Sequence, residues 1–255
     1  MTSVRSLPDD MAAKGHSKKW LENAERRGVP EHVVAEIARR HTVTPESFEI
    51  LEKLEEIKDP HGKSFFLLPA GTSGDDARKA ALMTSIVNAG TDYGKAGKQP
   101  GDFPETPYSA AEVARIINRQ KANSWSYSRD VRFVDRNGGR LVTTPNGMLM
   151  GLGGNWIQRQ FSRRGGTTWG DIFMIKMRYP TDPAERLRRI VQSGHVGNLH
   201  LDRLLHHEER HCQQWAAKGY AGMLRDYGRE LVRELVFGET NRLEEDAGLS
   251  DAGYR

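Results

Sequence analysis

One helix near the end of the chain, predicted at residues 201–218, constrains the fold more than any other segment. Gly219 is placed where helices commonly end in the left-handed conformation. His207 and His211 stand four residues apart on this helix, so their side chains project side by side. The apolar residues recur at helical spacing and predict one buried face: Leu201, Leu204, Leu205, Cys212 and Trp215. The chain must therefore pack this helix against a core while holding two neighbouring imidazoles.

The two imidazoles are spaced to bind one divalent cation. Two histidines so placed can ligate a tetrahedral Zn²⁺, each nitrogen lying about 2.0–2.1 Å from the ion. Glu208 directly follows His207, so it points beside the ion and can accept a proton from zinc-activated water. The segment His207-Glu208-Glu209-Arg210-His211 therefore predicts a zinc-dependent hydrolase with Glu208 as general base. The alternative is a pair of surface histidines on a charged helix face.

A catalytic zinc site of this kind needs a third protein ligand and one open position for water. An intervening helix, predicted at residues 221–236, would turn the chain back and bring Glu244 to the histidine pair. We predict Glu244 as the third ligand, with Glu245 as the alternative. Asn241 and Glu244 also have the spacing of a capping box, in which the glutamate only satisfies a backbone donor. The sequence leaves ligand and cap both open.

The rest of the chain predicts an α+β fold that is mostly helical. Helical spacing marks residues 18–58 (two short helices joined near 41–44), 76–88, 109–120 and the chain after Pro183. Strand-length apolar runs occupy residues 131–134, 140–142, 148–152 and 171–177. The first two runs flank Asp135-Arg136-Asn137-Gly138-Gly139, which is typical of a tight hairpin. We therefore predict a small antiparallel sheet packed beside the zinc-binding helix.

A stretch rich in glycine and proline, residues 90–107, reads as a linker or long surface loop. It places a domain boundary near residue 105. Residues 1–105 are predicted to form a helical N-terminal region, and residues 106–255 a zincin-like metallopeptidase domain. The N-terminal region resembles no known family. Its role could be a delivery signal, an inhibitory segment, a docking unit for a secretion-system or other protein partner, or ordinary structural support.

Composition limits the classes of protein and site. Cys212 is the only cysteine, so an intrachain disulfide cannot form and a metal site must use His, Asp and Glu. No stretch approaches the roughly 18 apolar residues of a membrane helix, and residues 1–19 lack the apolar core of a signal peptide. We therefore expect no membrane partner, and a cytoplasmic location or export by a non-classical route. The basic clusters at residues 163–164 and 186–189 are more typical of solvated faces than of a nucleic-acid-binding surface.

Residues from about 167 to 254 resemble a family of compact gluzincin-type domains found in bacterial effector and toxin proteins. The matching motifs are Thr168-x-Gly170-Asp171-Ile172-Phe173, Leu204-Leu205-x-His207-Glu208-x-x-His211-x-Gln213, Gly219-Tyr220, and Asn241-x-x-Glu244-x-x-Ala247. The resemblance covers about a third of the chain. It implies that His207, His211 and Glu244 are zinc ligands, that Glu208 is the catalytic base, and that the substrate is a peptide or protein.

Further residues are candidates for supporting roles. The same resemblance implies that the strand at 171–176 is the sheet edge beside the metal helix, where an extended peptide could pair with it; the alternative is an ordinary core strand. Gln213 and Asp202 are candidates for orienting an imidazole, although exposed polar residues of a helix are the commoner explanation for them. An oxyanion-stabilising donor is expected among four residues. The four donor candidates are His195, His200, Tyr220 and Tyr254. The alternative to an enzyme is a non-catalytic metal-binding or partner-docking module, or a nucleic-acid-binding protein.

Overall fold

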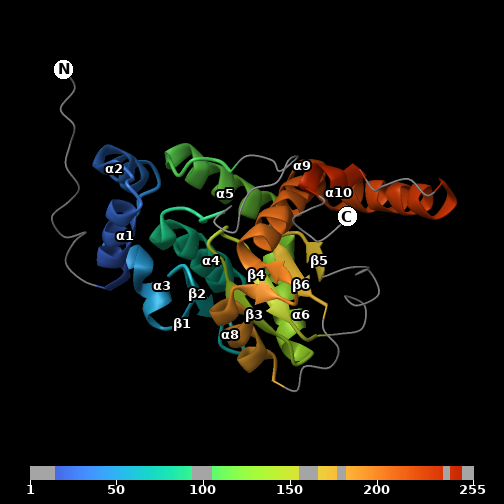
Figure 1. The fold of residues 1–255 in the computed structure, drawn as a ribbon, viewed down its shortest axis with the longest axis horizontal. Coiled ribbons are helices and arrows are strands. Elements are labelled where there is room, and N and C mark those ends of the chain that lie inside the picture. The colour runs from blue at the N-terminus through green and yellow to red at the C-terminus, as the bar shows by residue number, and fades with distance from the viewer. Residues whose placement is uncertain (1–14, 94–104, 155–165, 177–181, 238–241, 249–255) are drawn as a thin grey trace.

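The computed structural model describes residues 15–93, 105–154, 166–176, 182–237 and 242–248. Within these residues a central sheet lies between two layers of helices, which agrees with the predicted α+β fold (Figure 1). The helices are α1 (Gly15–Arg26), α2 (Glu31–Arg40), η2 (Pro45–Phe48, a 3₁₀ helix), α3 (Glu49–Glu52), α4 (Gly74–Asn88), α5 (Ala110–Ala122), α6 (Ser124–Arg136), α8 (Pro183–Ser193), α9 (Leu201–Phe237) and α10 (Arg242–Ala247).

The sheet is mixed, with strand order β1-β2-β3-β4-β6-β5. Its strands are β1 (Glu55–Lys58), β2 (Ser64–Leu67), β3 (Arg140–Thr143), β4 (Leu149–Leu152), β5 (Gly166–Trp169) and β6 (Ile172–Ile175). Neighbouring strands are antiparallel except for β4 and β6, which are parallel. The predicted antiparallel sheet is therefore corrected to a mixed one. Strand β6 lies inside the sheet, and β5 forms the edge.

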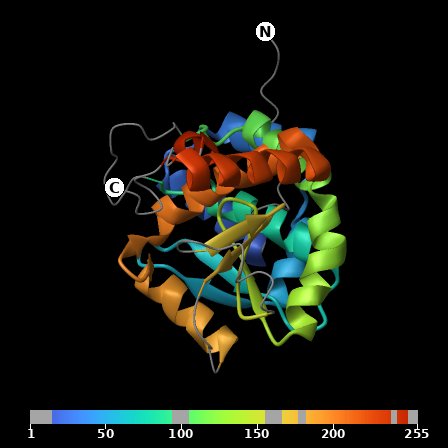
Figure 2. The ribbon, with the colours of Figure 1, turned by 90° about the vertical axis from the view of Figure 1, so that its right-hand side faces the viewer.

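Both faces of the sheet are buried, because its apolar side chains alternate between two cores. Phe65 and Phe66 are neighbours on β2 but belong to different clusters. One cluster joins the sheet to α1 through α6, and the other joins it to α8 and the first half of α9. Figure 2 shows α6 (lime green) and α8 (orange) on either side of the strands. The predicted zinc-binding helix therefore packs directly on the sheet.

Local capping explains several of the predicted helix starts. Ser109 accepts a hydrogen bond from the backbone N–H of Glu112, and Ser73 caps α4 in the same way. Thr44 caps η2, with Pro45 at its first position. The predicted helices at 76–88 and 109–120 are confirmed, with α4 beginning two residues earlier. No helix in the described part of the chain combines the length and apolar character needed to cross a membrane.

The predicted hairpin around residues 135–139 is wrong. Residues 131–134 belong to α6, and only residues 140–143 form a strand. Tyr127, Val131 and Val134 are buried at helical spacing, a pattern that residues 131–134 taken alone do not reveal. Gly138 and Gly139 end the helix instead of turning a hairpin, since their N–H groups bond to carbonyls of its last turn. A short hairpin also interrupts the helices expected after Pro183, with strands β7 (His195–Val196) and β8 (Leu199–His200).

The N-terminal region contributes strands as well as helices. Strands β1 and β2 precede residue 105, and β2 pairs with β3, which follows it. One apolar cluster likewise contains side chains from both regions. The sheet and this cluster therefore join residues on both sides of the boundary predicted near residue 105. Most of the predicted linker, residues 94–104, lies outside the described residues.

Candidate metal centre

Helix α9 carries the histidine pair on a buried segment. Leu201, Leu204, Leu205 and Cys212 pack into the sheet, as the sequence predicts. The helical run breaks at Gly219, which has φ of 67° and ψ of 170°. The first helical run therefore ends where predicted, and the chain continues as a second run to Phe237.

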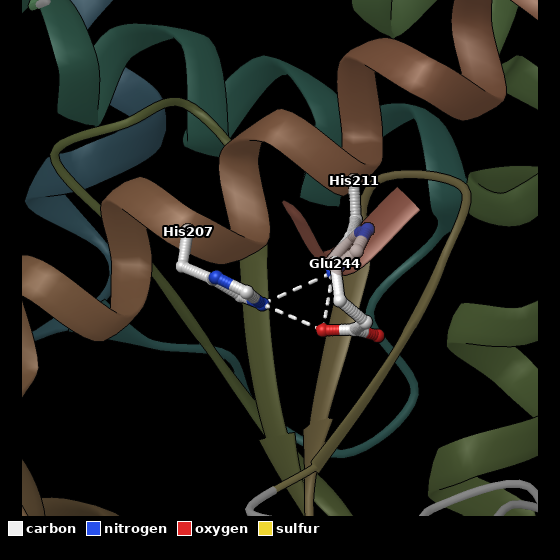
Figure 3. A group of neighbouring side chains, drawn as sticks. All are labelled: His207, His211 and Glu244. Carbon is white, nitrogen blue, oxygen red and sulfur yellow. Dashed lines mark hydrogen bonds and ion pairs between the residues drawn. The ribbon is translucent and has the colours of Figure 1, made fainter. Parts of the chain in front are cut away.

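Three donor atoms meet beside this helix (Figure 3). The Nε2 atoms of His207 and His211 lie 3.1 Å apart. Glu244 Oε2, from α10, lies 3.3 Å from the first nitrogen and 3.5 Å from the second. A tetrahedral Zn²⁺ at about 2.0–2.1 Å from each donor requires donors about 3.3 Å apart. The donor triangle therefore has the size that zinc needs.

The two imidazoles turn their Nε2 atoms toward each other. His207 Nδ1 lies 3.0 Å from the backbone carbonyl oxygen of Gly248, which can only accept a hydrogen bond. His211 Nδ1 lies 2.9 Å from the side-chain oxygen of Gln214. When Nδ1 of each ring donates a hydrogen bond, Nε2 of the neutral imidazole carries a lone pair and can act as a metal ligand. Two lone pairs and a carboxylate thus face one another, an arrangement that requires a positive charge between them.

Glu244, and not Glu245, is the carboxylate that faces the histidines. Glu245 is exposed to solvent. Helix α10 is held against α9 by a two-bonded ion pair between Arg210 and Asp246, and its Leu243 is buried. Asn241 of the alternative capping box lies outside the described residues. The position of Glu244 is consistent with the ligand role.

The charges of the cluster shift the proton affinities of its members. Burial disfavours the charged form of His211, but the hydrogen bond to Glu244 and the charges of Glu244 and Glu208 outweigh it and raise the pKa of His211 to about 9. Burial also disfavours ionised Glu244, yet hydrogen bonds with both histidines hold its pKa well below the usual range. In the metal-free protein, a proton on His211 therefore takes the place of a cation.

This proton gives a pH prediction. We expect Zn²⁺ binding near pH 7 to release about one proton per chain, because His211 must lose it to become a ligand. Calorimetry in buffers of different ionisation enthalpy measures the release.

The raised pKa of His211 also stabilises the folded metal-free protein. This contribution is fully present below pH 6.5, the ordinary pKa of histidine, and is lost as pH rises to about 9. The His211→Asn variant should lack that decline, and zinc uptake without proton release would contradict the prediction.

Glu208 is buried next to the donor triangle and is held by the edge strand. Its carboxylate Oε2 accepts a hydrogen bond of 2.6 Å from the Thr168 hydroxyl on β5. Burial raises the pKa of Glu208 despite the opposing attraction of His207 and His211. The carbonyl of Thr168 accepts a second bond from the indole N–H of Trp215, at 3.1 Å. Thr168 thus ties the edge strand to α9 at the level of the metal site.

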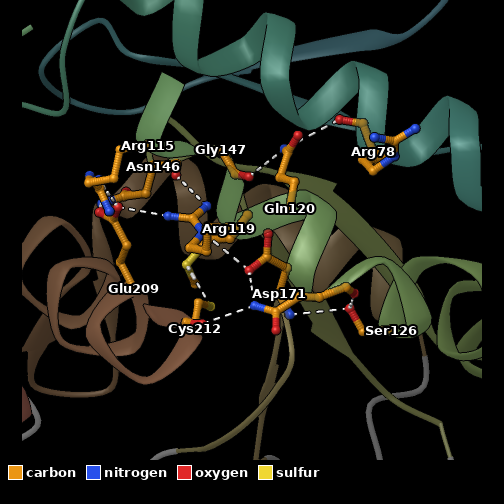
Figure 4. A network of polar contacts seen from close by, with 12 residues as sticks. Arg78, Arg115, Arg119, Gln120, Ser126, Asn146, Gly147, Asp171, Glu209 and Cys212 are labelled. Carbon is orange, nitrogen blue, oxygen red and sulfur yellow. Dashed lines mark hydrogen bonds and ion pairs between the residues drawn. The ribbon is translucent and has the colours of Figure 1, made fainter. Parts of the chain in front are cut away.

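A buried polar network fixes α9 relative to the β5–β6 turn (Figure 4). Arg119 on α5 donates to Asp171, in the turn, and to Glu209, the neighbour of Glu208. Asn146 also donates to Glu209, at 2.8 Å. Nearly complete burial makes each of these charges costly unless it is paired. The network therefore specifies how the helix and the hairpin sit on each other.

The structure does not support the residues predicted to orient the imidazoles. Gln213 accepts a hydrogen bond from Arg210 instead of contacting a histidine. Asp202 Oδ2 is buried without a hydrogen-bond partner in the described part of the chain. Side chains three residues apart share a helix face whereas those two apart do not, so Gln214 and not Gln213 reaches His211. Gln214 was not predicted, although its helical spacing from His211 was a signal that could have found it.

Those residues predicted as oxyanion donors that the structure describes make contacts with groups other than the three candidate metal ligands. His195 and His200 pair across the β7–β8 hairpin, with ring centroids 4.6 Å apart. Tyr220 packs against an aromatic cluster, 4.9 Å from the ring of Trp125. Tyr254 lies outside the described residues. Trp215 and Cys212 are buried, as predicted for core residues.

The basic cluster at residues 186–189 has carboxylate partners in the structure. Arg188 forms ion pairs with Glu55 and Glu185, and Arg189 pairs with Glu185. The cluster at residues 163–164 lies outside the described part of the chain. The described cluster is thus partly neutralised, as expected for a solvated face.

Comparisons of the chain with protein-family models, curated proteins and solved structures found no match.

Proposed function

We propose that this chain is a zinc-dependent hydrolase, and specifically a metallopeptidase. The donor triangle of His207, His211 and Glu244 is the observation that carries the proposal. Its edges of 3.1, 3.3 and 3.5 Å suit tetrahedral Zn²⁺. Among the described residues, three side chains make up the group, so a tetrahedral ion would keep one position open. An open position is typical of catalytic zinc, whereas structural zinc usually has four protein ligands.

Glu208 is the residue that we assign as general base. A bound Zn²⁺ would polarise a substrate carbonyl and acidify water. Thr168 holds Glu208 Oε2, which leaves Oε1 to accept the proton of the attacking water and later deliver it to the leaving amine. The raised pKa of the buried carboxylate suits this task, because a base is most effective when its pKa approaches the working pH.

A peptide substrate is favoured by the sheet edge beside the site. Strand β5, not the predicted strand at 171–176, is the last strand on this side of the sheet in the described part of the chain, and it packs against α9. An extended peptide can add to such an edge through main-chain hydrogen bonds. The Thr168 carbonyl already accepts a bond from Trp215, which leaves the part of β5 toward Gly166 for pairing. The effector or toxin role and a partner for the N-terminal region stay predictions.

The test uses untagged protein, because a histidine tag would itself bind zinc. We expect about one zinc per chain by elemental analysis. We also expect cleavage in a proteome-derived peptide library, read by mass spectrometry, that 1,10-phenanthroline stops and added zinc restores. Failure to take up zinc would overturn the whole proposal. Zinc uptake with no cleavage across the library would overturn the peptidase assignment and favour a non-catalytic metal site.

A further inference from the structure

Gln214 connects the two halves of the candidate metal site. It lies on α9, three residues after His211, and is buried. Its side-chain oxygen accepts a hydrogen bond from His211 Nδ1 at 2.9 Å. Its amide nitrogen donates to the carbonyl of Leu243 at 3.0 Å and to Asp246 Oδ2 at 2.9 Å. One side chain therefore contacts a candidate ligand on α9 and the helix that carries another.

These contacts determine the orientation of the amide and of the imidazole. Both N–H groups of Gln214 point at atoms that can only accept, so the amide oxygen must face His211. His211 Nδ1 then keeps its proton, and Nε2, which is turned toward Glu244, is the nitrogen that becomes a ligand once its own proton leaves. The acceptors Leu243 and Asp246 lie on either side of Glu244 in α10. The amide thus orients the imidazole of His211 directly, and it holds Glu244 in place through contacts with the helix that carries it.

Helix α10 depends on such contacts because it is short. It has six residues, and isolated helices shorter than about 12 residues are marginal in water. It is held by Gln214, by the Arg210–Asp246 ion pair, and by burial of Leu243 and Ala247. Of these, Gln214 is the contact that also reaches a candidate ligand.

We propose that Gln214 is a positioning residue that couples the docking of α10 to the capture of a divalent cation. This inference rests on the metal site of the proposed function. Loss of the amide would release His211 from its fixed orientation and loosen the helix that bears Glu244. Affinity for the metal should then fall even though all three ligands are still present.

The test compares Gln214→Leu with Gln213→Leu, the same substitution at the neighbouring glutamine, which bonds Arg210 instead of His211. Zinc affinity is measured by competition with a chelator, and Co²⁺ absorption reports the ligand geometry. We expect Gln214→Leu to weaken zinc binding about 10- to 100-fold, the usual effect of losing a partner of a ligating histidine. We also expect weaker Co²⁺ bands and faster hydrogen exchange in residues 242–248. Gln213→Leu should match the unsubstituted protein.

A second, isosteric variant covers the case in which Gln214→Leu does not fold. Gln214→Glu keeps an acceptor for His211 but loses both donors and places a negative charge beside Asp246. We expect weaker zinc binding, and tighter binding again in the double variant with Asp246→Asn, whose amide can donate to the new carboxylate. Unchanged affinity and Co²⁺ spectrum in the folded Gln214 variants would overturn the coupling while leaving the metal site intact. The coupling would also be overturned if the double variant bound zinc no more tightly than Gln214→Glu. A parent protein that takes up neither metal would instead overturn the proposed function.

Discussion

Replacing Glu244 with glutamine is expected to weaken zinc binding by two to three orders of magnitude. Zinc sites with four protein ligands have apparent binding free energies of about 10–16 kcal/mol, so one ligand contributes about 2.5–4 kcal/mol. Each 1.4 kcal/mol corresponds to about a tenfold change in affinity. The amide keeps the shape of the side chain but loses the negative charge that lies 3.3 and 3.5 Å from the two imidazole nitrogens. Chelator competition measures the change.

The matched control is Glu245→Gln, the same substitution one residue later. Glu245 is exposed, so this variant should bind zinc within about twofold of the parent protein. The pair of variants also separates the two third-ligand assignments that the sequence leaves open. If Glu245→Gln loses zinc and Glu244→Gln keeps it, the assignment of Glu244 is wrong.

Replacing Glu208 with glutamine is expected to lower peptide hydrolysis by about 10²- to 10⁴-fold, the range that a general base contributes. Glutamine can still accept the hydrogen bond of 2.6 Å from Thr168, so the local packing should persist. It cannot accept a proton from water, which removes the proposed chemistry. The measurement is kcat/KM on a peptide identified in the library screen.

Zinc content distinguishes a loss of chemistry from a loss of the site. Glu208→Gln should keep about one zinc per chain, because Glu208 is not among the three grouped donors. Glu245→Gln should retain both zinc and activity. Full activity in a zinc-loaded Glu208→Gln protein would show that another residue acts as the base.

The sequence was most informative where structure depends on neighbours along the chain. Ser109 and Thr44 cap helices and Gly219 ends a helical run, features that act within one turn of the chain. The spacing of His207 and His211 was enough to place their imidazoles side by side. Local rules failed at residues 131–134, because a short apolar run is compatible with both strand and helix periods.

Contacts between distant segments were decided only by the tertiary structure. The sequence predicts Glu244 as the third neighbour of the histidines, with Glu245 as the alternative, and only the docking of α10 on α9 turns the first toward the imidazoles and leaves the second exposed. The bond from Thr168 to Glu208 spans 40 residues, and that from Arg119 to Glu209 spans 90. The sequence by itself determined the α+β class, the histidine-bearing helix and its capping signals, since these follow from spacing along one element. The sheet order, the edge strand and the third member of the donor triangle depend on packing between elements, and no local pattern encodes it.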